Sequence, residues 1–165
     1  ERFFGTTRFL LIYFLGGLGG SVLSVLLNPP AVTSVGASGA VFAIFGAEMI
    51  FLYRHRQLLG PAATFQLRQL LIIAGINFVY GIATSLAPGD GVRIDNWGHV
   101  GGWLGGLALA WIIGPMLVVR PHPQEPGTMV GEDINPLQDR YQPLLAYTSF
   151  LLALLVVGTL VVRVL

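Results

Sequence analysis

The sequence contains no cysteine and no lysine, and only 10% of its 165 residues are charged. Without cysteine, neither a disulfide framework nor a thiolate metal site is available. Soluble domains usually carry about a quarter charged residues, so this composition argues against a soluble fold. The net charge of +1 and the lack of a basic patch give no indication of nucleic-acid binding.

Hydrophobic residues make up 54% of the chain and gather in five long blocks. A helix rises about 1.5 Å per residue, so about 20 residues cross a hydrocarbon core of about 30 Å. Because backbone polar groups in lipid must be satisfied within the segment, we expect an all-α, polytopic membrane bundle of five transmembrane helices. The blocks are Phe9 to Leu27, Ser38 to Tyr53 (broken only by Glu48), Leu70 to Ala87, Asn96 to Val119, and Tyr141 to Val162.

The arginines predict how these helices are oriented. If the spans alternate, seven of the nine arginines fall on one side of the membrane, and by the positive-inside rule that side is cytoplasmic. The loops Asn28 to Ala37 and Pro88 to Asp95 then face outward. Residues 120–140 hold four prolines and half of the acids, which predicts a flexible cytoplasmic linker. It would separate a four-helix unit (1–119) from a lipid-facing last helix (141–165).

Ser38 lies at the outer start of the second predicted helix, within Gly36-Ala37-Ser38-Gly39. One alternative is that it is a helix N-cap or a small interface residue. The flanking glycines, however, keep Cβ atoms away, so a substrate backbone has room to approach. Free N–H groups at this helix start, with Gly36, Ala37 and Gly39 as backbone support, would stabilise an oxyanion.

His99 lies near the outer start of the fourth predicted helix. A histidine within a membrane span is costly and indicates a functional site by default, although a hydrogen-bonded packing role stays open. Two helical stripes run inward, Ser38-Phe42-Gly46 and His99-Gly102-Gly106. If they face each other, the glycines permit close contact and Phe42 packs on the imidazole. His99 would then act as the general base for Ser38.

Other polar residues keep alternatives open. Asp95 lies one turn outward from His99 and is interpreted as a solvated loop residue or a cap, not as a third catalytic member. Glu48 lies about 15 Å further inward than Ser38 and is assigned a structural role. A transporter or proton relay using His99, Glu48 and Asn77 is a competing hypothesis, but it does not explain the glycine-flanked serine.

At these residues the sequence strongly resembles the rhomboid intramembrane proteases. Their signature is G-x-S-G, followed two spans later by a histidine with small-residue spacing. Here these are Gly36 to Gly39 and His99 to Gly102, extended to Gly106. The resemblance implies a serine endopeptidase that cleaves transmembrane segments of other proteins near the outer face. The dyad would be Ser38 and His99, and no metal, nucleotide or other cofactor is implied.

The resemblance covers about Glu1 to Ile113 and extends to Asn77 and to the opening residues. It maps these helices onto the third to sixth of six core helices, with the last helix as an added seventh. It therefore implies a fragment without the N-terminal helices, one of which completes the family's oxyanion site. The implied partners are transmembrane substrates and the bilayer, with substrate access bordered by the third span. The alternative is a catalytically silent rhomboid-like protein that binds membrane clients.

Overall fold

The computed structural model describes residues 1–29, 34–86, 94–125 and 127–164. Most of the chain is helical, as the sequence predicts. The helices are α1 (Gly5–Leu27), α2 (Ser38–Arg54), α3 (Arg56–Leu59), α4 (Pro61–Leu86), α5 (Asn96–Ile113) and α6 (Tyr141–Val164), and a 3-10 helix η1 (Leu137–Arg140) precedes the last. Strands β1 (Leu117–Pro121) and β2 (Met129–Asp133) form an antiparallel hairpin.

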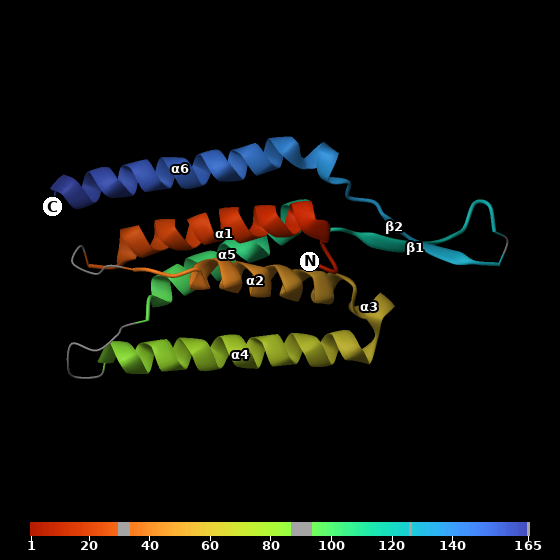
Figure 1. Ribbon diagram of the computed structural model, residues 1–165, viewed down its shortest axis with the longest axis horizontal. Helices are drawn as coiled ribbons and strands as arrows, with labels where there is room; N and C mark the ends of the chain where they lie inside the picture. Colours follow the sequence, from red (N-terminus) through yellow and green to blue (C-terminus); the bar gives the residue numbers. More distant parts are fainter. Residues whose placement is uncertain (30–33, 87–93, 126, 165) are drawn as a thin grey trace.

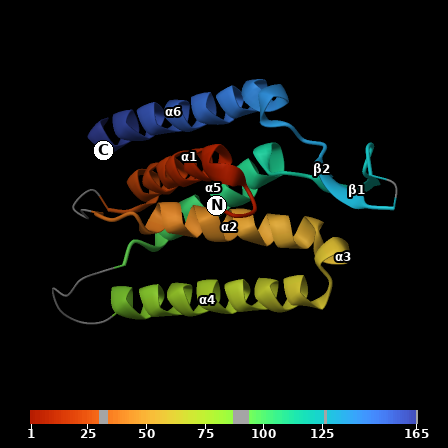
Figure 2. The ribbon, with the colours of Figure 1, turned by 45° about the vertical axis from the view of Figure 1, so that its right-hand side comes forward.

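The helices α1, α2 and α5 form the centre of the bundle and make most of their contacts with one another. Figure 1 shows α6 along one side of this centre, next to α1, and α4 along the opposite side, next to α2. The turned view in Figure 2 preserves this order, with the hairpin projecting from one end of the bundle. We call this the hairpin end, and the opposite end, where α2 and α5 begin, the site end.

Glycines allow the central helices to pack backbone against backbone. A Cβ added at Gly102 would overlap the carbonyl oxygen of Gly39, and one at Gly106 would overlap that of Ala43. Both contacts join α5 to α2, and their order shows that the two helices run in the same direction. In lipid, helices associate largely through such close packing, so these small residues fix how α2 and α5 lie together.

Among the described residues, three helices are long and apolar enough to cross a membrane: Gly5–Leu27, Pro61–Leu86 and Leu137–Val161. The shorter α2 and α5 have 17 and 18 residues. Large apolar side chains project outward from α4 and α6; Val79 is 68% exposed and Leu145 is 62% exposed. These are surfaces suited to lipid. The helical bundle is therefore confirmed, while the number of five spans stays a prediction.

The fourth apolar block is not helical to its end at Val119. α5 ends at Ile113, since Pro115 has no backbone N–H to continue the helical hydrogen bonds. Residues 117–121 form β1 instead, and β1 pairs with β2 inside the segment predicted as a linker. The sequence pattern did not predict this hairpin, because its strands are short and lie among prolines and charged residues.

Polar side chains tie the hairpin end together. Asn135 is 2% exposed, and its Nδ2 donates to the Gly114 carbonyl at the end of α5 (2.7 Å). From α1, Arg8 donates to the Asn135 carbonyl (2.6 Å) and pairs with Asp133 (2.8 Å). From the end of α2, His55 accepts the Leu117 N–H at Nε2 (2.9 Å). The segment 114–135 therefore holds all three central helices.

Candidate active site

The turn before α2 presents Ser38 at the site end. Gly36 has φ +146°, a left-handed conformation that favours glycine. The cap position of α2 is Ala37, and no side chain in the described part of the chain caps this helix. Ser38 is exposed, and its hydroxyl makes no hydrogen bond to any described residue. The alternative of a capping serine is therefore not what the structure shows, and the first N–H groups of α2 stay open to a ligand.

His99, in the first turn of α5, is only 7% exposed. Its ring stacks on Phe42 of α2, with centroids 4.3 Å apart and planes 17° apart. Phe42 in turn packs against Phe78 of α4, with centroids 5.6 Å apart. The imidazole Nδ1 is buried and has no hydrogen-bond partner among the described residues. A packing histidine would normally satisfy such an atom, so the protein holds this ring by its face and leaves its polar edge unused.

The starts of α2 and α5 meet at glycines that adjoin the two residues. A Cβ added at Gly39, next to Ser38, would lie 3.0 Å from the Gly98 carbonyl oxygen, next to His99. Gly20 of α1 also faces Gly98, at 2.6 Å by the same measure. Serine and histidine therefore each adjoin one backbone contact between their helices. Gly102 and Gly106 of α5 contact Gly39 and Ala43 of α2. These two residues each follow by one position the predicted contact residues Ser38 and Phe42.

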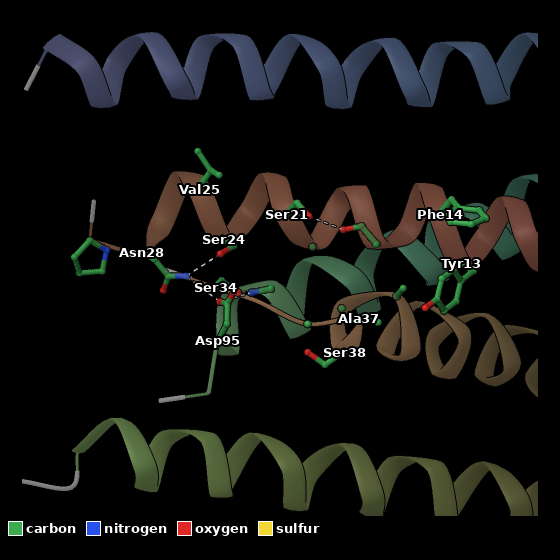
Figure 3. A pocket seen from close by; sticks show the side chains of 17 residues that line it. Tyr13, Phe14, Ser21, Ser24, Val25, Asn28, Ser34, Ala37, Ser38 and Asp95 are labelled. Atoms are coloured by element: carbon green, nitrogen blue, oxygen red, sulfur yellow. Dashed lines mark hydrogen bonds between the residues drawn. The ribbon is translucent and has the colours of Figure 1, made fainter. Parts of the chain in front are cut away.

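A cavity of about 490 Å³ opens between α1, the described parts of the loop after it, and the start of α2. Figure 3 shows Ser38 and Asp95 at this cavity, with hydroxyl and amide side chains of α1 and the loop around Asp95. The cavity collects the serine half of the predicted site: its lining includes Gly36, Ala37, Ser38 and Gly39. The other half, His99, Phe42, Gly102 and Gly106, lies in the contact between α2 and α5.

Asp95 caps α5, as one of the two interpretations from sequence has it, and accepts the Gly98 N–H at 2.8 Å. It also accepts the Asn28 amide (2.9 Å) and the Ser34 hydroxyl (2.5 Å). Burial alone would raise the pKa of this carboxyl, but the hydrogen bonds from Ser34, Gly98 and Asn28, together with the nearby Ser24 hydroxyl, outweigh burial and lower it. The bonds to Asn28 and Ser34 could not be predicted from the sequence. The only local indication was the three-residue spacing of Asp95 and Gly98, which is typical of a helix cap.

Two further polar residues lie away from this constellation. Glu48 accepts a hydrogen bond from Gln66 of α4. Asn77 is exposed and donates to the Ile73 carbonyl of its own helix (2.8 Å). No hydrogen bond among the described residues links Glu48, Asn77 and His99, so the proton-relay hypothesis gains no support. Within the described ranges, no three acidic or histidine side chains are grouped to hold a metal ion.

The sequence that forms this site is similar to known proteins. A family model described as "Rhomboid domain" matches residues 1–116. Rhomboid protease GluP of Bacillus subtilis is 37% identical over 115 residues, which cover 69% of this chain and 20% of that protein. RHOMBOID-like protein 4 of Arabidopsis thaliana is 34% identical over 122 residues, or 74% and 27% of the two chains. Rhomboid-like protease 3 of Toxoplasma gondii is 34% identical over 115 residues, or 66% and 38%.

The matched region thus spans about a fifth to two fifths of the length of these relatives. The match includes both helix starts described above and ends just before β1. The hairpin and α6 lie outside the family model. No solved structure matches the chain.

Proposed function

Because this chain belongs to the rhomboid family, whose relatives include named proteases, we propose that it forms the catalytic part of an intramembrane serine endopeptidase. Ser38 is the nucleophile and His99 is the general base. The observation that carries the proposal is the Gly39–Gly98 contact, which joins the starts of α2 and α5 beside the serine and the histidine. An exposed hydroxyl and a ring with an unused polar edge are thereby brought to one end of the bundle.

The chemistry follows from these groups. Ser38 Oγ attacks the carbonyl carbon of the scissile bond while His99 takes the hydroxyl proton. The imidazolium then gives this proton to the departing amine, and an acyl-enzyme forms. Water, activated by the same imidazole, releases the carboxylate product and regenerates the serine. No metal or cofactor is needed for any of these steps.

The oxyanion formed during attack needs donors that are in place beforehand. The first turn of α2 offers backbone N–H groups that lack helical partners. Gly36 shapes the turn before them through its positive φ, and neither Gly36 nor Gly39 carries a Cβ that would block a substrate backbone. Gly36, Ala37 and Gly39 therefore support the oxyanion through the backbone.

The packing around His99 determines where its ring points. Phe42 covers one ring face, which limits rotation of the imidazole, and the ring is otherwise free of polar restraint from the described residues. Gly102 and Gly106 let α5 approach α2 closely enough for this stacking. In this arrangement the glycines set the distance between α5 and α2, and Phe42 sets the orientation of the imidazole ring.

The substrate class follows from the surroundings of the site. The chain is part of an integral membrane protein. From the positive-inside rule and the arginine distribution, we propose that the hairpin end is cytoplasmic and that the site end faces outward. We propose five spans, with α2 and α5 crossing inside the bundle. The partners are then transmembrane segments of other proteins, cleaved near the outer surface of the bilayer.

Labelling with a fluorophosphonate probe tests the proposal on the protein as its gene encodes it. The wild type is expected to be labelled, and Ser38→Ala and His99→Ala are expected to lose labelling. Ser149→Ala, on the exposed side of α6, is the matched control and should label as the wild type does. Absence of labelling in a folded wild type would favour the silent client-binding alternative and reject the enzyme.

A further inference from the structure

One carboxylate holds three segments together at the site end. Asp95 Oδ1 accepts from Asn28 Nδ2 (2.9 Å) and from the Gly98 N–H (2.8 Å), and Oδ2 accepts from Ser34 Oγ (2.5 Å). Asn28 is the residue that ends α1, and its amide also donates to Ser24 (3.0 Å). The three donors belong to the end of α1, to the loop before α2 and to the first turn of α5.

Two of these donors lie close in sequence to a reacting residue, and the third lies at the end of α1, the helix that contacts both α2 and α5. Ser34 is four residues before Ser38, and Gly98 directly precedes His99. α1 packs against both helices, with Gly20 facing Gly98 and lying 3.4 Å from the Gly39 Cα by the added-Cβ measure. A substitution at Asp95 would therefore displace the segments next to Ser38 and His99 together.

We propose that Asp95 is a positioning residue, which sets the separation of Ser38 and His99 by joining the loop before α2 to the first turn of α5. The inference rests on the proposed function. Asp95 touches neither the substrate nor the reacting atoms in this role. It acts because rate falls steeply when reacting groups are displaced by about 1 Å, and because it bonds to Ser34, four residues before the serine.

Hydrogen-bond geometry, and not negative charge, is what this role requires. An asparagine at position 95 keeps a carbonyl oxygen where Asn28 and Gly98 donate, and asparagine caps helices as well as aspartate does. Its amide faces Ser34, whose hydroxyl turns to accept in place of donating. Alanine removes all three bonds. The two substitutions at Asp95 therefore separate positioning from electrostatic assistance to His99.

The test compares Asp95→Ala, Asp95→Asn and Asp139→Ala in the protein as its gene encodes it. Asp139 is an exposed acid of η1, away from the site, and serves as the control. The readouts are the rate constant of fluorophosphonate labelling, kcat and KM on a transmembrane substrate, the pH dependence of kcat, and thermal unfolding. Asp95→Ala is expected to lower kcat and the labelling rate about ten- to a hundredfold with little change in KM.

Asp95→Asn is expected to recover most of this loss in kcat, whether or not the acid side of the pH profile shifts when the carboxylate charge near His99 is removed. Wild-type rates in folded Asp95→Ala would overturn the inference. Rates of Asp95→Asn as low as those of the alanine variant would overturn it as well. Either result would leave the proposed function standing. If Asp95→Ala does not fold, the double variant Asn28→Ala/Ser34→Ala, which keeps the α5 cap, must show the same fall in kcat or the inference fails. An unlabelled wild type would instead reject the proposed function.

Discussion

A single methyl group at Gly102 should separate the two helices that carry the proposed dyad. The Cβ of Gly102→Ala would lie 2.6 Å from the carbonyl carbon of Gly39 and 2.9 Å from its Cα, and closer still to its oxygen. Ordinary contacts between carbon atoms are about 3.5–4.0 Å, so the backbones must move apart by about 1 Å. Neither side of the contact is a flexible side chain, and α2 and α5 must therefore shift as whole helix starts.

Overpacking of this kind costs about 1–3 kcal/mol, and a displacement of about 1 Å between reacting groups costs about a hundredfold in rate. Thermal unfolding in detergent measures the first effect, and the fluorophosphonate labelling rate measures the second. The matched control is Gly75→Ala on α4, where an added Cβ meets no atom of the described residues within 4 Å. Alanine should there stabilise the helix by up to about 1 kcal/mol, because it has the higher helix propensity.

Equal stability and labelling of Gly102→Ala and the wild type would refute this reasoning, since the close contact of α2 and α5 would then be unnecessary. A Gly75→Ala variant that loses as much as Gly102→Ala would also refute it, because the effect would be general to glycines of the bundle.

Three further predictions concern stability. Asn135→Ala should lower the unfolding temperature. The substitution removes the buried amide at the end of α5 and leaves the Gly114 carbonyl without its donor, at a cost of about 1–3 kcal/mol. Burial raises the pKa of Asp133, but the backbone N–H groups of Asn135 and Met116 and the Arg8 guanidinium lower it overall. Its stabilisation is thus present above about pH 4 and is lost as pH falls through the folded-state pKa, which unfolding scans of the wild type and Asp133→Asn would reveal. Tyr147→Phe should raise the unfolding temperature slightly, because the tyrosine hydroxyl is buried without a partner among the described residues.

Each of these has a contrary result. An Asn135→Ala variant as stable as one carrying Gln138→Ala, an exposed neighbour, would show that the amide does not hold the hairpin end. Parallel pH curves for the wild type and Asp133→Asn would remove that carboxylate from the acid response. A less stable Tyr147→Phe would mean that the hydroxyl has a partner after all.

The sequence predicts the helical bundle well because long apolar blocks have few alternatives in lipid. It also singles out Ser38 and His99 as candidates, because a glycine-flanked serine is unusual and a histidine inside a membrane span is costly. The joint action of the two residues stays a prediction. The close contact of Gly102 with α2 could be expected from small-residue spacing, but its partner, Gly39, depends on helix rotation, which spacing alone does not fix.

Long-range polar contacts are what sequence patterns could not reveal. Asn28 and Asp95 are 67 residues apart, and nothing in either local sequence indicates the other. The same holds for Arg8 and Asp133, which are 125 residues apart. Such pairs form only after the helices have packed, so their signal lies in three dimensions. The short β1 and β2 were missed for a related reason, since each strand satisfies its backbone only through the other.

Mass spectrometry of the fluorophosphonate adduct tests the central claim most directly, because it identifies the modified atom instead of total labelling. The account predicts one adduct, on the peptide that contains Ser38, formed at neutral pH and absent from His99→Ala. An adduct on another residue, or an adduct at Ser38 that forms as fast without His99, would contradict the pairing of serine and histidine as nucleophile and base.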